Sequence, residues 1–143
     1  YNGPGKHAYI HKQKYFEKNQ PMPVNIVLGS DPLIWFAASC PVPAGISEFD
    51  FAGGLGGKPI EVIRSDITGL PYPADAEIVL EGEIRPGELK EEGPFGEWPG
   101  YYASPKSLEP FIRVKRILHR NNPILSCANP ARPPHRTRPG RRR

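Results

Sequence analysis

The sequence predicts an α+β fold in which helices come first and an antiparallel sheet or barrel follows. Helix-like segments, separated by one short strand, occupy the first part of the chain, whereas the segments after Pro59 alternate apolar and polar residues as strands do. Nineteen prolines and fifteen glycines are spread along the chain, so turns punctuate many short elements. A chain of 143 residues that is 38% hydrophobic has room for one domain.

Three segments carry the residues that start and stop helices. The first, 7–19, has helical spacing and ends before two prolines. The second, 32–40, follows a Ser-Asp pair that can cap it and has proline in its first turn. It is apolar nearly all round, so we expect it to be buried. The third begins at Ser47 and stops at a glycine pair, 56–57.

The strand prediction rests on β-branched residues and on alternation with a period of two. Segment 77–84 shows it best, with Ile78, Leu80, Gly82 and Ile84 predicted on a buried face and Glu77, Val79, Glu81 and Glu83 on the other. The other segments complete the pattern: strands are expected at 24–29, 59–66, 111–120 and 124–128, and turns at 70–76, 85–88 and 121–123.

Charge is unevenly distributed along the chain. The net charge is +4, but the last sixteen residues hold six arginines and no acid, and removing those six from 19 Lys+Arg leaves 13 against 15 Asp+Glu, a net charge of −2. We expect 129–143 to be a disordered Arg/Pro-rich tail and expect no nucleic-acid partner, because the body lacks basic and aromatic support for one. Salt-sensitive binding of nucleic acid by the tail is the alternative.

Localisation is predicted to be cytoplasmic. No apolar run approaches the roughly 18 residues of a membrane span, and charged residues follow the first five residues where a signal peptide would be apolar. Two cysteines are too few for a disulfide scaffold or a closed zinc site, so reduced thiols are the default.

The stretch EEGPFGEWPGYY, residues 91–102, is the strongest candidate for chemistry. Glu92 and Glu97 flank a Gly-Pro-Phe-Gly corner, and burial or a nearby like charge can raise the pKa of a carboxyl until it is a useful acid near neutral pH. A solvated acidic hairpin loop is an equally good interpretation of the spacing alone.

Other candidate sites are weaker. His7 and His11 stand four residues apart on a predicted helix, a spacing that can place two metal ligands on one face. The glycines of 53–57 end a helix and favour a hinge over a phosphate-binding loop. Cys127 has no evident histidine partner and is better interpreted as a small core residue.

Several longer runs resemble one family. PMPVNIVLGSDP, AASCPVP, GISEFDFAGGLGGKPIEV and PADAEIVLEGEI, followed by EEGPFGEWPGYY, occur in the order and near the intervals of the UbiD family of decarboxylases. The resemblance covers roughly Lys6 to Pro134. It implies a mostly antiparallel split β-barrel like that of flavin reductases, with N-terminal helices, and removal of CO₂ from an aromatic or α,β-unsaturated carboxylic acid with prenylated FMN.

The resemblance also implies roles for particular residues. Glu92 corresponds to the acid that pairs with a catalytic arginine, and Glu97 to the acid that protonates the carbon. Glu48 corresponds to a carboxylate ligand of a divalent metal, Mn²⁺ or Mg²⁺, beside the cofactor phosphate, with K⁺ as a further candidate ion. The remaining cofactor positions line the flavin or lie near its phosphate: Ala38, Ser39, Cys40 and Pro41 for the flavin, and Lys6 or His7 for the phosphate.

The family's arginine, and an asparagine that also holds the metal, correspond to positions before Tyr1. Residues 1–128 thus resemble the central domain of such an enzyme without its N- and C-terminal domains, and we expect this chain alone to be inactive and its parent to be a homo-oligomer. The alternative is a flavin-binding split-barrel module, a reductase or electron-transfer partner, with no decarboxylase activity.

Overall fold

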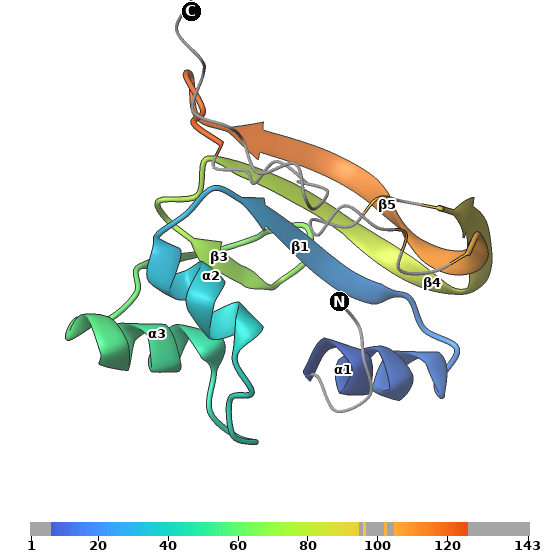
Figure 1. The fold of residues 1–143 in the computed structure, drawn as a ribbon, viewed down its shortest axis with the longest axis horizontal. Helices are drawn as coiled ribbons and strands as arrows, with labels where there is room; N and C mark the ends of the chain where they lie inside the picture. The colour runs from blue at the N-terminus through green and yellow to red at the C-terminus, as the bar shows by residue number, and fades with distance from the viewer. Residues whose placement is uncertain (1–6, 95, 97–101, 103–104, 126–143) are drawn as a thin grey trace, which may run out of the picture. The chain divides into compact units, whose positions relative to one another are not determined.

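The structure, a computed structural model, describes residues 7–94, 96, 102 and 105–125 and confirms an α+β fold with antiparallel sheets (Figure 1). By their contacts, the described residues divide into two compact units. The first comprises the residues up to Pro86 together with Ile112–Leu125, and the second lies within Gly87–Phe111. The predicted tail at 129–143 lies outside the described residues.

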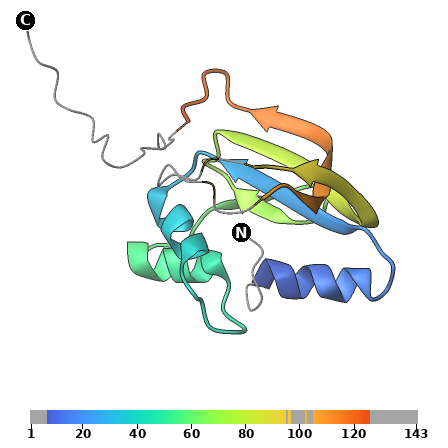
Figure 2. The same cartoon turned by 45° about the vertical axis from the view of Figure 1, so that its right-hand side comes forward.

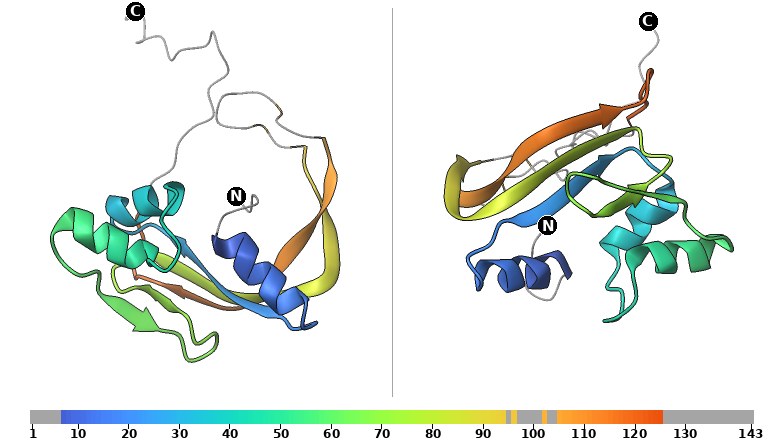
Figure 3. Two further views of the ribbon diagram at one scale, coloured as in Figure 1. Left: turned by 90° about the horizontal axis from the view of Figure 1, so that it is seen from below. Right: turned by 180° about the vertical axis from the view of Figure 1, so that it is seen from behind.

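The three predicted helices are present. α1 spans His7–Phe16, three residues shorter than predicted, and contacts β1 (Figure 3). α2, Pro32–Ser39, begins after Asp31, whose Oδ1 accepts the Leu33 amide proton with an N–O distance of 2.8 Å. α3, Glu48–Gly56, begins after Ser47 and ends at Gly57, which adopts φ 68. Within the described residues, no helix is long and apolar enough to cross a membrane.

The prediction that α2 is buried is wrong. α2 and α3 lie against each other (Figure 2), but Ala37 is the only buried residue of α2, and Trp35 is 77% exposed. The sequence gives no polar face that would reveal which side stays uncovered. α2 therefore buries one side against α3 and leaves aromatic surface on another.

The main sheet has the strand order β1-β4-β5 and is built around the long strand β4. β1, Met22–Leu28, pairs antiparallel with β4, Ile78–Glu92, from Met22 opposite Ile84 to Leu28 opposite Ile78. β5, Ser107–His119, pairs on the other side of β4. A separate two-stranded sheet joins β2, Val62–Arg64, to β3, Pro71–Pro73. The described strands thus form two sheets, and closure into a split barrel stays a prediction.

Several strand and turn predictions are wrong in detail. The predicted strand at 59–66 shrinks to β2, the turn at 70–76 contains β3, and 124–125 is not strand. The predicted turn at 85–88 lies inside β4, where Gly87 adopts φ 74 and the chain continues to Glu92. Pairing with β5 has overridden a local turn signal there.

The predicted faces of 77–84 are also wrong, because β4 is buried on both. Glu81, expected in solvent, is fully buried, and Glu83 is nearly so. β4 has a partner strand on each side, and cationic side chains of β5 supply the countercharges that allow acids to be buried there.

Candidate functional site

One of the two predicted catalytic acids lies at the end of β4. Glu92 is the last residue of β4, its side chain is exposed, and Gly93 follows with φ 83. Glu97 lies outside the described residues. In the described part of the chain, no cation lies within ion-pairing distance of Glu92. The arginine implied by the family resemblance is therefore not supplied by this part of the structure.

Two cross-strand contacts hold the strand ends next to Glu92. Lys106 Nζ lies 2.6 Å from Glu91 Oε2, and Lys90 Nζ lies 4.5 Å from the centre of the Phe111 ring. Further out, Gly96 and Tyr102 form an antiparallel bridge. The two acids of 91–92 are thus distinguished by the structure, since Glu91 has a partner in Lys106.

Two other predicted residues, far apart in the sequence, come together. His7 Nδ1 lies 3.0 Å from Glu48 Oε1, although 41 positions separate the residues. His7 is the first residue of α1 and Glu48 the first of α3, so two helix N-termini, which carry partial positive charge, meet at this contact. Both side chains are partly exposed and can reach a ligand.

The distance between these two atoms suits a divalent cation. Two neighbouring ligands of an octahedral ion, each about 2.1 Å from the metal, are about 3.0 Å apart. His7 and Glu48 could therefore hold one ion together or share a hydrogen bond. No third histidine, cysteine, aspartate or glutamate of the described residues joins them as a metal cluster. His11, the other histidine of the predicted pair, is exposed and has no part in this contact.

The predicted flavin-lining stretch forms the end of α2. Ala38, Ser39 and Pro41 are exposed and Cys40 is half-buried. The Cys40 amide donates to the carbonyl oxygens of Phe36 and Ala37, so the helix ends here and the chain becomes extended. Sequence reasoning missed the neighbouring Trp35, whose indole is highly exposed beside this stretch. Lys6 lies outside the described residues.

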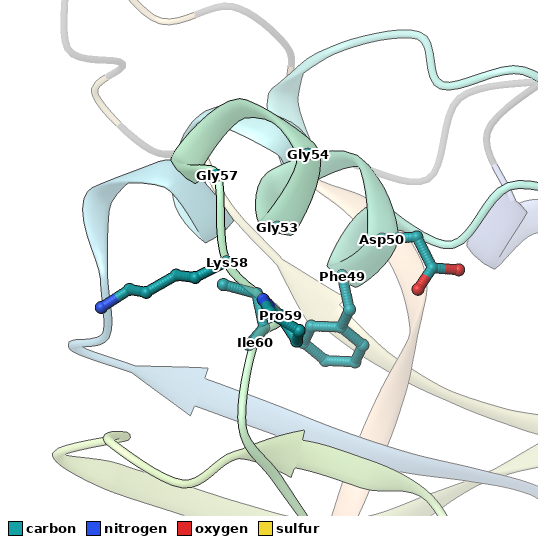
Figure 4. Close-up of a pocket in the computed structure, with 8 residues that line it drawn as sticks. All are labelled: Phe49, Asp50, Gly53, Gly54, Gly57, Lys58, Pro59 and Ile60. Atoms are coloured by element: carbon teal, nitrogen blue, oxygen red, sulfur yellow. The ribbon is translucent and has the colours of Figure 1, made fainter.

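Two cavities lie apart from the predicted site. One, of about 410 Å³, lies between α3 and the segment after it; Figure 4 shows Phe49 directed toward Pro59 and Ile60. The other, of about 300 Å³, is lined by residues that include Asp31, Asp75 and Arg120. Neither is lined by a residue predicted to hold the cofactor, metal or substrate.

An ion network on β4 is the main feature that sequence reasoning missed. Arg116 of β5 donates to the buried Glu81 and to Asp66, and these hydrogen bonds hold the pKa of both carboxyls below their ordinary values. Lys115, at 2.5 Å, and Arg85, at 2.7 Å, donate to Glu83 and lower its pKa in the same way. The alternation of residues in β4 predicts Glu81 and Glu83 in solvent. Their burial depends on cationic partners on β5, which alternation within β4 does not reveal.

Comparison with known proteins places this chain in a family. Residues 3–133 match the family profile described as UbiD, 3-octaprenyl-4-hydroxybenzoate carboxy-lyase Rift-related domain. A phenolic acid decarboxylase of Bacillus subtilis (strain 168) is 45% identical over 116 residues, which cover 81% of this chain and 24% of that protein. The chain therefore spans about a quarter of that relative's length.

Solved structures also match the fold of this chain. The UbiD-class enzyme HmfF of Pelotomaculum thermopropionicum, solved with FMN, superposes with a TM-score of 0.80 at 31% identity, over 87% of this chain and 28% of that one. An evolved dimeric form of HmfF was solved with prFMN. Vanillic acid decarboxylase of Sedimentibacter hydroxybenzoicus, in its open form, superposes with a TM-score of 0.75 at 39% identity, over 88% of this chain and 27% of that one. Because the family profile covers nearly the whole chain, the protein belongs to the UbiD family.

Proposed function

We propose that this chain is the cofactor-facing part of a decarboxylase that removes CO₂ from an aromatic or α,β-unsaturated carboxylic acid with prenylated FMN. Family membership and relatives named as decarboxylases of phenolic and vanillic acids support this over a flavin module of unrelated activity. The parent is proposed to be a homo-oligomer.

The contact between His7 and Glu48 is the observation that carries the proposal. It gives a nitrogen and an oxygen donor 3.0 Å apart at two helix N-termini. Hard divalent cations prefer oxygen donors, and helix N-termini attract phosphate. We assign the pair to a Mn²⁺ or Mg²⁺ ion beside the cofactor phosphate, with His7 added as a metal ligand to the predicted Glu48. K⁺ is a further candidate ion.

The two predicted acids take separate roles in this proposal. When bound, the flavin supplies the electron sink that an amino-acid side chain cannot provide. As CO₂ leaves, its bonding electron pair stays with the substrate, and the carbon needs one proton. Glu97 donates that proton and regains one from water. Glu92 stays ionised and pairs with an arginine supplied from outside the described residues.

The remaining predicted positions would contact the flavin. Ala38, Ser39 and Pro41 are exposed at the end of α2, and an exposed helix end leaves room for a flat ring to approach the backbone. Cys40 contributes a half-buried thiol beside them. Lys6 is proposed to help bind the phosphate from its place directly before His7.

Metal binding tests the site on the chain itself. Titration of Mn²⁺ in the presence of FMN, followed by electron paramagnetic resonance, should show about 10- to 100-fold weaker binding for His7→Ala and Glu48→Gln. His11→Ala is the matched control, because it removes an exposed histidine from the same helix. Equal Mn²⁺ affinity in the wild type and in all three variants would contradict the metal assignment.

A second experiment separates decarboxylation from a flavin module. In the parent protein that supplies the arginine, Glu97→Gln should abolish CO₂ release while the flavin remains bound, as judged by its absorbance. Unchanged turnover in that variant would favour the flavin module.

A further inference from the structure

Helix α1 has ten residues, and none of them is buried. Figure 2 shows the helix beside β1 and joined to it by the short segment 17–21. Apart from His7, the partly buried residues of α1 recur at helical spacing and form one face: Tyr9, Lys12, Tyr15 and Phe16. The described residues therefore cover this face of α1 only in part.

The side-chain contacts within α1 join its residues to one another. Gln13 Nε2 donates to Tyr9 Oη with an N–O distance of 3.1 Å, and Lys12 Nζ lies 5.3 Å from the centre of the Tyr9 ring. Such contacts at a spacing of three or four residues stabilise a helix only slightly. Isolated helices shorter than about 12 to 15 residues are marginal in water. The helical state of α1 therefore depends on its contacts with the rest of the fold.

The contact between His7 and Glu48 ties the first residue of α1 to α3. Its two atoms lie 3.0 Å apart, and both side chains are partly exposed. An exposed ion pair contributes little to stability, because water already solvates both groups and the side chains lose freedom when they meet. The pair alone therefore holds the start of α1 only weakly, and local opening of the helix costs little.

The segment 17–21 has the features of a hinge. Asn19 adopts φ 52, a left-handed conformation that asparagine tolerates, and the Gln20 amide donates to the Tyr15 carbonyl oxygen with an N–O distance of 2.9 Å. A few residues at the end of an element can absorb the change in backbone angles when that element moves. β1 is paired with β4 from Met22 onward. α1 can therefore leave the sheet without disturbing it.

The charge of α1 suits an anionic ligand at its first turn. The helix carries Lys12 and Lys14 and no acidic residue. A divalent cation held by His7 and Glu48 would link α1 to α3 by two coordinate bonds, and a phosphate beside the ion would meet the partial positive charge of the helix N-terminus. A ligand that binds only the docked arrangement shifts the equilibrium toward docking.

We propose that α1 is a lid, which docks and becomes ordered when a divalent cation and the cofactor phosphate bind at His7 and Glu48, and which undocks about the segment 17–21 when they leave. The lid rests on the proposed function for its ligand. Its own basis is the unburied helix, the weak tie at its first residue and the hinge behind it.

Hydrogen exchange of the 143-residue chain, followed by mass spectrometry, tests the docking. With Mn²⁺ and FMN at about 100 times their dissociation constants, amides of 11–16 should exchange about tenfold or more slowly than in the ligand-free chain, within the roughly 100-fold limit set by linkage. The exposed strand β2, at 62–64, should keep its rate. His7→Ala should abolish the slowing, and His11→Ala, an exposed position of the same helix, should retain it.

A variant remote from the ion separates docking from coordination. Phe16 lies nine positions after His7, about 14 Å along the helix axis, so Phe16→Ala removes part of the docking face and no metal ligand. It should speed exchange of α1 in the ligand-free chain. It should also weaken Mn²⁺ binding about three- to tenfold, because a site that is docked for less of the time binds more weakly. Ile10→Ala is the matched control, since it truncates an exposed apolar residue of the same helix.

The outcomes distinguish the lid from the metal site. Mn²⁺ binding without slower exchange of 11–16 would overturn the lid and leave the metal site in place. A Phe16→Ala variant with wild-type Mn²⁺ affinity would also overturn the lid. A wild-type chain that binds no Mn²⁺ in the presence of FMN would overturn both the lid and the proposed metal site.

Discussion

The Glu81 carboxylate lies fully buried on the central strand, and Arg116 balances its charge. Burial alone would favour the neutral acid, but the hydrogen bond from Arg116 outweighs it, so the pKa of Glu81 falls below its ordinary value of 4.5. One oxygen of this carboxylate, Oε1, accepts no hydrogen bond from the described residues. The fold therefore depends on keeping a charged guanidinium at this position of β5.

This arrangement predicts an acid-sensitive contribution to stability. Because the folded pKa of Glu81 is lowered, its contribution is present above about pH 4.5 and is lost as the pH falls below that value. Glu81→Gln should lower the free energy of unfolding by roughly 2–4 kcal/mol at pH 7 and by less near pH 3.5. Urea unfolding at both pH values measures this, with Glu109→Gln as an exposed control; an equal loss at both pH values would contradict the prediction.

The roles of single residues in the site follow from the family resemblance and stay predictions. The family resemblance assigns Lys6 or His7 to the phosphate and Glu48 to the metal, and in the structure His7 Nδ1 lies 3.0 Å from Glu48 Oε1. Their contact could not be predicted from the sequence, because it depends on how α1 and α3 pack. Glu81 was misplaced because alternation describes a strand by itself and not the strand beside it.

At the scale of elements, local signals predicted helices better than strands. α2 and α3 start after capping residues, and α3 ends at Gly57, where the left-handed conformation suits glycine. These signals act within a few residues. β4 instead continues through a Pro-Gly pair, because pairing with β5 determines its length. Most of the predicted strand at 59–66 is absent for the converse reason, since the short β3 is its only partner among the described strands.

The cap of α3 links this element to the proposed metal site. Ser47 Oγ accepts the Phe49 amide proton with an N–O distance of 3.1 Å, directly before Glu48. Ser47→Ala should cost about 1 kcal/mol of stability. It should also weaken Mn²⁺ binding more than that loss alone explains, because the first turn that orients Glu48 frays. Thermal unfolding and the Mn²⁺ titration measure the two effects, with Ser107→Ala as an exposed control; unchanged Mn²⁺ affinity would show that Glu48 is oriented without the cap.

At the scale of the whole molecule, the fold class was predictable because composition and periodicity average over many residues. The division of the described residues into two compact units was not, because it depends on which strand segments share buried contacts. Residues 79–84 of β4 contribute Val79 and Ile84 to the buried core, whereas those of the same strand after Pro86 are exposed or partly so. One strand therefore belongs to a buried sheet along part of its length and to an exposed hairpin along the rest.

This difference predicts non-uniform stability along one strand. Segments with few buried contacts and exposed backbone hydrogen bonds open locally without unfolding the core. In hydrogen exchange followed by mass spectrometry, peptides from 87–92 and 107–111 should exchange about tenfold or more faster than peptides from 22–28 and 78–84. Glu81→Gln should speed exchange in the second group and leave the first nearly unchanged, because Glu81 lies in the first unit. A single rate for both groups would mean that the hairpin and the buried sheet unfold together, and that the two compact units are not independent in stability.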